Sequence, residues 1–456
     1  MQGPFDKGEN AGSMKASPPL SAHAQGRQPS AIRVAGIEFS RRNDDTQAIN
    51  VAIGNVSLPM HPRMRECLRS MGETTGDFSD GVVRYTPTVG TTAARDTIKK
   101  IIRASVPASQ RTRIDNLHVQ MTDGGSQAME LMILACCGPA GSEARPLLII
   151  DAAYTNYLAF AARLGRKVVS VRRYLTPEGR FPLPDRAKLK EAFERYNPGA
   201  VVIIPYDNPT GTLYRNEDLK SLAELCVEHN CWLVSDEAYR ELHYVEEEAP
   251  SLWSLSDADV PGIEGRRIGI ETASKVWNAC GLRIGALVTD NETLHTQCVA
   301  ENTASLCPSA IGQAVFASLG QETEDELQTW FAQQRGYYKS LVSSFYEGMR
   351  TSLPGAIISR PEASLYSVID VKPLVDETFS SLDFVMWCAQ EGRVDTPEGP
   401  RTLLTAPMEG FYDRNTQPEN TGRTQFRVAF VEGPDLIPKI PPLFTQLLTT
   451  YLERKK

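Results

Sequence analysis

Four short polar motifs follow one another in the middle of the chain, and each carries side chains that can do chemistry. They are Asn208-Pro-Thr-Gly211, Asp236-Glu-Ala-Tyr239, Thr272-Ala-Ser-Lys275 and Gly281-Leu-Arg283-Ile-Gly285. A lysine amine can attack a carbonyl or carry a proton, a carboxylate can hold a positive charge, and an arginine fork matches an anion. Taken singly, each motif also has an ordinary structural interpretation, such as a turn, a helix N-cap or a solvated side chain.

The segments that must position these motifs predict alternating strands and helices. The apolar runs that predict strands are 117–122, 147–151, 167–171, 200–205, 231–235, 267–271 and 284–289. Runs without polar alternation are typical of strands that are buried on both faces of a mainly parallel sheet. We therefore expect an α/β three-layer sandwich with such a sheet at its centre. Ligands of these sheets bind beyond the carboxyl ends of the strands, where the motifs fall.

The two ends of the chain differ from this middle part. Residues 1–28 are rich in Gly, Ser, Ala, Pro and Gln and predict a disordered tail, and residues 32–40 predict a first ordered arm. After about residue 325 a long helix, short strands and a final helix predict a smaller α+β domain. We expect the following division: tail and arm 1–45, N-terminal part of the small domain 46–75, large domain 76–324, and C-terminal small domain 325–456.

Composition excludes several classes of protein. The 456 residues include 48 Lys and Arg against 56 Asp and Glu, a net charge of −8 that disfavours nucleic-acid binding. The longest apolar runs are far shorter than the ~20 residues of a membrane helix. Nine cysteines without a C-x-x-C pair indicate no metal site and predict reduced thiols in a cytoplasmic protein. No N-terminal signal segment is apparent, so secretion is not expected.

In their order and spacing, the four motifs resemble the fold-type I pyridoxal-phosphate enzymes, in particular the class I/II aminotransferases of the aspartate aminotransferase-like branch. The resemblance runs from about residue 48 to the C-terminus. It also includes the segments 84–90, 123–128, 153–157 and 426–430. It implies the pyridoxal-phosphate transferase fold, pyridoxal 5′-phosphate as cofactor, and transfer of an amino group from an L-amino acid to a 2-oxo acid.

The resemblance also implies roles for residues around the cofactor ring. Lys275 would form a Schiff base with the cofactor and then act as a general acid and base. Asp236 would pair with the pyridine nitrogen and so keep the ring an electron sink. Tyr239 and Asn208 would bind the phenolic oxygen, and Tyr154 would stack on the ring. Lys275, Asp236 and Tyr239 are therefore the expected catalytic residues.

The cofactor phosphate is expected at the start of a predicted helix, where free backbone N–H groups attract an anion. The residues that the resemblance places there are Gly125, Ser126, Gln127, Thr272, Ser274 and Arg283. Tyr85 would reach the phosphate from a neighbouring subunit. A monomer would then lack part of its site, so a homodimer is expected.

For the substrate, the resemblance points to Arg427, whose planar fork matches the α-carboxylate. Asn208 is expected to contact the same carboxylate, and Gly54 to lie in a turn that closes over the substrate.

The chain departs from the common pattern of the family at Trp277, at Tyr366 and in the polar segment 411–422, which is expected near the substrate entrance. These departures leave the side-chain specificity open, and either aromatic residue is compatible with an aromatic substrate.

Two alternatives remain open at this point. A pyridoxal-phosphate lyase or synthase that eliminates from Cβ or Cγ uses the same fold and the same Lys, Asp and Arg. A non-catalytic regulator on the same scaffold is disfavoured, because the N-terminal segment is too short and too polar for an added DNA-binding region and the net charge is acidic.

Overall fold

The computed structural model describes residues 18–27, 29–73, 76–245 and 248–454. Most of the expected tail, residues 1–17 and 28, lies outside the described residues. The described part of the N-terminal segment contains the short helix α1 (Ala22–Gln25) and then α2 (Ala31–Ser40). Helix α2 buries Ala35 and packs against α13 (Ser381–Gln390), so the expected ordered arm is a docked helix.

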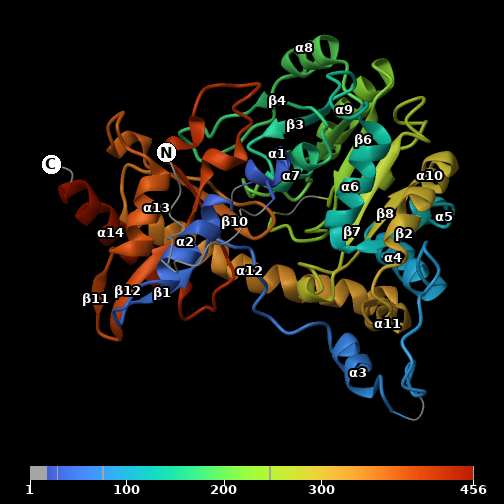
Figure 1. Ribbon diagram of the computed structural model, residues 1–456, viewed down its shortest axis with the longest axis horizontal. Helices are drawn as coiled ribbons and strands as arrows, with labels where there is room; N and C mark the ends of the chain where they lie inside the picture. Colours follow the sequence, from blue (N-terminus) through green and yellow to red (C-terminus); the bar gives the residue numbers. More distant parts are fainter. Residues whose placement is uncertain (1–17, 28, 74–75, 246–247, 455–456) are drawn as a thin grey trace.

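A seven-stranded sheet forms the centre of the larger part of the molecule, in the right half of Figure 1. Its strands, in spatial order, are β2 (His118–Asp123), β8 (Ile284–Thr289), β7 (Arg267–Thr272), β6 (Trp232–Asp236), β5 (Ala200–Ile203), β3 (Leu147–Asp151) and β4 (Val168–Arg172). Strand β8 is antiparallel to both of its neighbours, and the other pairings are parallel. The expected mainly parallel central sheet is confirmed.

Helices cover both faces of this sheet. They are α4 (Thr92–Ala104), α5 (Arg111–Ile114), α6 (Gly124–Cys136), α7 (Thr155–Arg163), α8 (Arg186–Tyr196), α9 (Asn216–Glu228), α10 (Glu292–Asn302) and α11 (Ala310–Ala317). Because side chains alternate along a strand, Leu148 and Ile150 of β3 pack in the core with α8 and α9. Leu147 and Ile149 belong to the core that contains α6 and α7. The result is the predicted three-layer sandwich.

Two smaller sheets lie at the other end of the molecule. The first is β1 (Gln47–Asn50), β12 (Gly399–Leu404) and β11 (Val394–Thr396); the second is β13 (Ala406–Pro407), β14 (Gln425–Ala429), β10 (Tyr366–Asp370) and β9 (Ile357–Ile358). Strand β1 pairs in parallel with β12, so segments from both ends of the chain share one sheet. The domain boundaries themselves stay a prediction.

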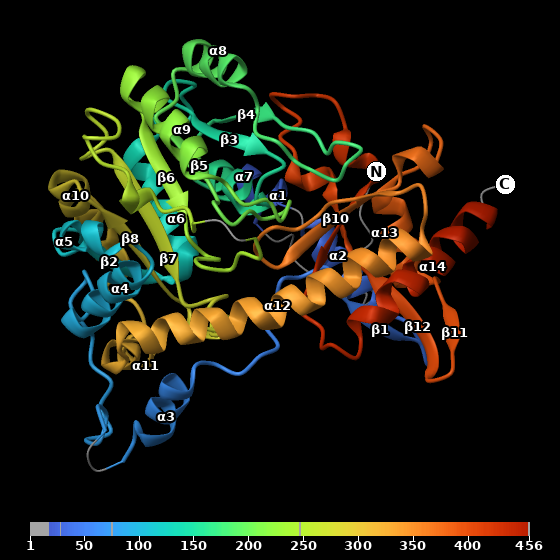
Figure 2. The same ribbon diagram turned by 180° about the vertical axis from the view of Figure 1, so that it is seen from behind.

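A long helix links the two regions. Helix α12 (Glu324–Ser352) contacts α4 beside the central sheet and α14 (Ile440–Arg454) beside the smaller sheets (Figure 2). Its N-terminus is closed by a capping box in which Thr323 and Glu326 bond each other's backbone N–H groups. The remaining α-helix, α3 (Pro62–Ser70), packs on α11 at the outer edge. None of the described helices is long and apolar enough to cross a membrane.

Short 3-10 helices complete the described structure. They are η1 (Ala108–Gln110), η2 (Leu252–Ser254), η3 (Cys280–Leu282), η4 (Thr303–Ser305), η5 (Ser318–Gln321), η6 (Lys372–Leu374), η7 (Met408–Phe411), η8 (Thr421–Thr424) and η9 (Ile437–Lys439).

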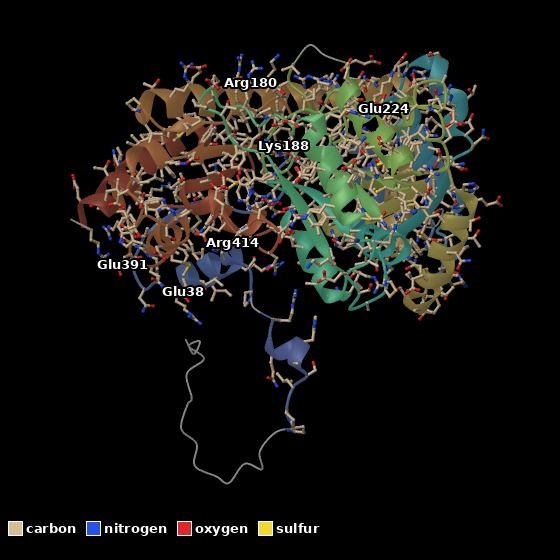
Figure 3. The ribbon with its side chains drawn as sticks, turned by 90° about the horizontal axis from the view of Figure 1, so that it is seen from above. Glu38, Arg180, Lys188, Glu224, Glu391 and Arg414 are labelled. Carbon is tan, nitrogen blue, oxygen red and sulfur yellow. The ribbon has the colours of Figure 1, made fainter. Side chains whose placement is uncertain are left out.

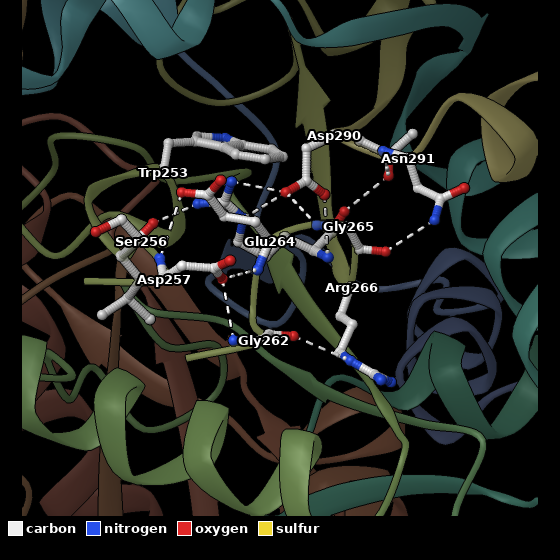
Figure 4. A network of polar contacts seen from close by, with 12 residues as sticks. Trp253, Ser256, Asp257, Gly262, Glu264, Gly265, Arg266, Asp290 and Asn291 are labelled. Carbon is white, nitrogen blue, oxygen red and sulfur yellow. Dashed lines mark hydrogen bonds and ion pairs between the residues drawn. The ribbon is translucent and has the colours of Figure 1, made fainter. Parts of the chain in front are cut away.

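A polar network fixes the beginning of β7, the strand that leads towards Lys275 (Figure 4). Asp290 Oδ2 accepts hydrogen bonds from Gly265 N and Arg267 Nε, each over 2.8 Å. Asn291 Nδ2 donates to Gly265 O over 2.9 Å. Because these bonds hold the start of β7, the lysine follows a strand that is anchored at its far end.

Candidate active site

The predicted site residues converge at one edge of the central sheet. Asp236 is the last residue of β6, Thr272 is the last residue of β7, and Asn208 and Tyr154 follow β5 and β3. These four strands are neighbours and parallel, so their carboxyl ends share an edge. The motifs therefore lie where ligands of open α/β sheets bind.

Asp236 is a buried carboxylate without a cation. Tyr157 Oη donates to its Oδ2 over 2.8 Å, and Ala238 N donates to its Oδ1 over 3.2 Å. Burial raises the pKa of Asp236 to about 6. No described lysine, arginine or histidine pairs with it. A carboxylate in this position fits a protonated ring nitrogen, which would provide the missing positive charge.

A chain of hydrogen bonds connects the tyrosine and asparagine of the two central motifs. Asn208 Nδ2 donates to Tyr239 Oη over 3.3 Å, and Arg427 Nη1 donates to Asn208 Oδ1 over 3.0 Å. The hydroxyls of Tyr239 and Tyr366 are hydrogen-bonded over 2.8 Å. Burial raises the pKa of Tyr239 well above its usual value, so its hydroxyl keeps its proton and can donate it in a hydrogen bond.

Arg427 is held in place, but one of its nitrogens has no partner among the described residues. It lies on β14, is buried, and donates from Nη2 to Ala52 O over 2.6 Å. Its Cζ lies 4.4 Å from the ring centroid of Tyr366 and 4.8 Å from that of Phe411. Its Nε has no hydrogen-bond partner among the described residues. A buried guanidinium with an unused N–H fits a carboxylate ligand.

Lys275 and Gly54 meet directly, because the lysine Nζ donates to the carbonyl oxygen of Gly54. A Cβ at position 54 would lie 2.1 Å from the Tyr366 hydroxyl, so a side chain there would force Tyr366 to move. The glycine thus allows the backbone to pass close to both the lysine and the tyrosine. The structure places the predicted substrate turn beside the predicted catalytic amine.

The start of α6 forms a cradle with Arg283. Gly124 has φ +66°, and a Cβ there would lie 2.4 Å from Arg283 Nη2. The same nitrogen lies 3.5 Å from Ser126 Oγ. Nearby, the hydroxyls of Thr272 and Ser274 are 2.7 Å apart. Backbone N–H groups, hydroxyls and a guanidinium that converge in this way fit a phosphate.

Three predicted residues need separate comment. Gln127 uses its side chain elsewhere, since its Oε1 accepts from Asp123 N and its Nε2 donates to Asn302, each over 2.8 Å. The expected anion site uses its backbone N–H at the start of α6. Tyr154 lies beside the site, and burial raises its pKa to about 12. Tyr85 is 80% exposed, in contrast to the buried Asn208, Asp236, Tyr239 and Arg427.

Sequence reasoning missed three residues that contact the site. Tyr157 follows Tyr154 by three positions on α7, a helical spacing that could have indicated its approach to Asp236. Tyr366 stood out as a departure from the family pattern, but no contact followed from that. Phe411 opens the polar segment 411–422, which was expected near the substrate entrance, but its contact with Arg427 was not predicted.

The ring of Trp277 is packed against α12 and is not accessible to a substrate. It is buried, its ring stacks on Trp330 at 6.3 Å and 3°, and Phe331 lies 5.6 Å away. Because α12 covers this side chain, its packing gives no support to a contact between Trp277 and an aromatic substrate. No group of described His, Cys, Asp and Glu residues is placed to hold a metal ion.

Comparison with known proteins adds sequence relatives to this geometry. The sequence profile of the family described as "Aminotransferase class I and II" matches residues 46–395. The chain is 27% identical to an aspartate/prephenate aminotransferase of Thermus thermophilus, over 78% of this chain and 86% of that protein. It is 28% identical to a 2-aminoadipate transaminase from another strain of Thermus thermophilus, over 54% of this chain and 59% of that protein.

Solved structures share the fold at lower sequence identity. An aspartate aminotransferase of Thermus thermophilus with maleate superposes with a TM-score of 0.73 at 20% identity, covering 94% of this chain and 100% of that one. A multiple substrate aminotransferase from Thermococcus profundus gives a TM-score of 0.75 at 18% identity, with 95% and 98% covered.

Proposed function

The chain belongs to the class I and II aminotransferase family and is an aminotransferase, and we propose that the site at the carboxyl ends of β3, β5, β6 and β7 holds pyridoxal 5′-phosphate. The observation that carries this proposal is the buried carboxylate of Asp236, which has no cation among the described residues and lies in one cluster with a lysine and an anion cradle. The relatives are transaminases, which favours transfer over the elimination alternative.

When bound, pyridoxal phosphate supplies a carbonyl for the amine and a ring that accepts electrons. Asp236 would hold the proton on the ring nitrogen, and Tyr157 would orient that carboxylate through its hydrogen bond. Tyr239 and Asn208 would bind the phenolic oxygen, with Tyr154 against the ring. Each of these side chains is fixed by a neighbour before any ligand arrives, which lowers the cost of reorganisation during the reaction.

Lys275 would move the proton that transamination requires. Its neutral amine would take the proton from the substrate Cα, a role worth about 10²–10⁴ in rate for a positioned base. The Gly54 carbonyl accepts a hydrogen bond from Nζ. This contact would hold the Lys275 amine on the substrate side of the site while the amine is not taking part in the reaction.

The phosphate would be bound by Gly125, Ser126 and the backbone N–H of Gln127 at the start of α6, by Thr272 and Ser274, and by Arg283. Arg427, with Asn208 and Gly54, would bind the α-carboxylate of an L-amino acid or a 2-oxo acid. The free Nε of Arg427 supports this role, since a carboxylate oxygen would satisfy it.

A homodimer would complete the site, with Tyr85 donating to the phosphate of the other subunit. The exposed fraction of this tyrosine, 80%, supports that role, and Val82 and Val83, close to it in the sequence, are also exposed. Mixing the inactive variants Tyr85→Ala and Lys275→Ala should restore activity, because half of the sites in a hybrid dimer would have both residues. No recovery in a verified hybrid would contradict the shared site.

The proposed cellular location is the cytoplasm. All nine cysteines are free thiols, which suits a reducing compartment.

A donor and acceptor panel tests the function. Purified holoenzyme with aspartate, 2-aminoadipate, phenylalanine or kynurenine should lose the visible absorbance of its cofactor and form the keto acid. A 2-oxo acid should then restore the absorbance. Release of ammonia or pyruvate without an acceptor would favour elimination, and no transfer across the panel would contradict the proposal.

A further inference from the structure

The polar segment Phe411–Gly422, called the polar loop below, has no place in the proposed chemistry. It connects η7 to η8 and comes just before β14, the strand that carries Arg427. The loop exposes Arg414, Asn415, Pro418 and Glu419 but buries Phe411, Tyr412 and Asp413. It leaves the smaller sheets and packs on β3 and β4, at the edge of the central sheet.

One arginine of the central sheet holds the far end of this loop. The side chain of Arg172, the last residue of β4, is 3% exposed. Its Nη1 donates to Glu419 O over 2.7 Å and to Thr421 Oγ1 over 3.1 Å, and its Nη2 donates to Gln417 O over 2.8 Å. Its Cζ lies 5.2 Å from the ring centroid of Tyr412. This buried arginine therefore makes three hydrogen bonds to the polar loop, two of them to backbone oxygens.

The end of β3 holds the near end of the loop. Asp151 Oδ2 accepts a hydrogen bond from Asp413 N over 2.9 Å, and Ala153 N donates to Phe411 O over 2.8 Å. Arg414 follows and lies where the green central sheet meets the red C-terminal segments (Figure 3). The two contacts fix the backbone on both sides of Tyr412, and thereby the direction of the Phe411 side chain.

Phe411 transmits this position to the substrate side of the site. Its ring centroid lies 4.8 Å from Arg427 Cζ. The neighbouring Tyr412 donates from its hydroxyl to Gln425 Oε1 over 2.6 Å, two residues before Arg427 on the same strand. The polar loop thus contacts the guanidinium through one residue and the strand that carries it through the next.

We infer that Arg172 and Asp151 are positioning residues for substrate binding: through the polar loop, they hold Phe411 against Arg427 and so set the affinity for the substrate carboxylate. This inference rests on the proposed role of Arg427. A guanidinium that is packed against a fixed ring is already oriented for its ligand, whereas a released one must be ordered when the ligand binds. In this inference, Arg172 contacts neither the cofactor nor the substrate and acts only through the polar loop.

The test compares Arg172→Met with the wild-type holoenzyme. We expect KM for both substrates to rise about tenfold. The Kd, measured by calorimetry, should rise by a similar factor of about ten. Its ligand is whichever of 2-oxoglutarate, pyruvate and phenylpyruvate binds the wild type most tightly. The kcat should stay within about twofold and the visible cofactor spectrum should not change. Hydrogen exchange in 411–422 should become faster. A loop that exchanges faster while Kd and KM stay at wild-type values would overturn the inference.

A matched control is Arg145→Met. Arg145 also donates hydrogen bonds to connecting segments, to Asn197 Oδ1 over 2.9 Å and to the backbone oxygen of Asn230. It lies before β3, at the opposite edge of the sheet. This variant should keep the wild-type Kd. A rise in Kd equal to that of Arg172→Met would also overturn the inference, since it would then reflect general loosening.

A second variant covers the case in which Arg172→Met does not fold. Phe411→Leu keeps an apolar side chain but removes the ring from Arg427, and we expect Kd and KM to rise severalfold with the cofactor spectrum unchanged. Unchanged Kd in Phe411→Leu would overturn the inference. Wild-type protein that binds cofactor and a 2-oxo acid but transfers no amino group would instead contradict the proposed function, and would leave the Kd comparison valid.

Discussion

Asn208 and Arg427 are hydrogen-bonded over 3.0 Å although 219 residues separate them in the sequence. The asparagine follows β5 of the central sheet, and the arginine lies on β14 of a smaller sheet. The same asparagine donates to Tyr239. The proposed contact to the cofactor and the proposed clamp for the substrate thus share one amide, which couples their positions.

Asn208→Ala should impair both sides of the site at once. It removes the acceptor of Arg427 Nη1, and an unsatisfied buried donor costs about 1–3 kcal/mol. It also removes one of the two hydrogen bonds of the Tyr239 hydroxyl, whose bond to Tyr366 remains. We expect kcat/KM to fall by about 10²-fold or more, with lower kcat and higher KM. Steady-state kinetics measures this. A change in KM alone would mean that the asparagine serves only the substrate.

Tyr366→Phe should separate the two contacts of this tyrosine. The variant loses the hydroxyl that bonds Tyr239 and keeps the ring beside Arg427. A single neutral hydrogen bond contributes about 0.5–1.5 kcal/mol, so kcat should fall about twofold to tenfold. KM should stay near the wild-type value, and Tyr366→Ala should raise it. Equal KM values in the two variants would show that the ring does not support Arg427.

The cofactor-free chain should show the cost of burying Asp236. Its pKa is raised from 3.8 to about 6 in the folded state, chiefly by burial. Because the folded state binds this proton more tightly than the unfolded state does, Asp236 stabilises the fold below pH 3.8. That stabilisation is lost as the pH rises through about 6. Relative to Asp236→Asn, the wild type should lose roughly 3 kcal/mol of unfolding free energy between about pH 4 and pH 7.

Denaturant unfolding of the two cofactor-free proteins at several pH values measures this difference. Adding pyridoxal phosphate should reduce the difference at neutral pH, because a protonated ring nitrogen favours the ionised carboxylate. If the difference in unfolding free energy between the two cofactor-free proteins does not vary with pH, burial does not raise the pKa of Asp236.

Local sequence was enough to predict the elements and motifs that depend on local chemistry. The run Leu147-Leu-Ile-Ile150 is a buried strand, and Asp236 and Thr272 end strands as the apolar patterns indicate. Contacts between distant segments were not predictable. The side-chain amide of Gln127, for example, bonds Asn302, 175 residues away. Such contacts arise from tertiary packing, which leaves no periodic signal in the sequence.

The aromatic residues show the same limit. Trp277 and Tyr366 looked equally suited to a substrate pocket in the sequence. The structure buries Trp277 against α12 and brings Tyr366 to Tyr239 and Arg427. Which of two aromatic side chains reaches the site depends on how the long helix crosses the molecule. The residues on either side of Trp277 contact this helix, because Trp330 Nε1 donates to Val276 O over 2.9 Å and Asn278 Nδ2 donates to Gln334 Oε1 over 3.0 Å.

Lys275 is the residue on which the account depends most, and its replacement by Ala should abolish transfer while preserving the fold. The most direct measurement is reduction of the purified holoenzyme with borohydride, followed by mass spectrometry of its peptides. The account predicts a reduced pyridoxyl-phosphate group on Lys275 and on no other lysine. A label on a different lysine, or no label in protein that contains the cofactor, would contradict it.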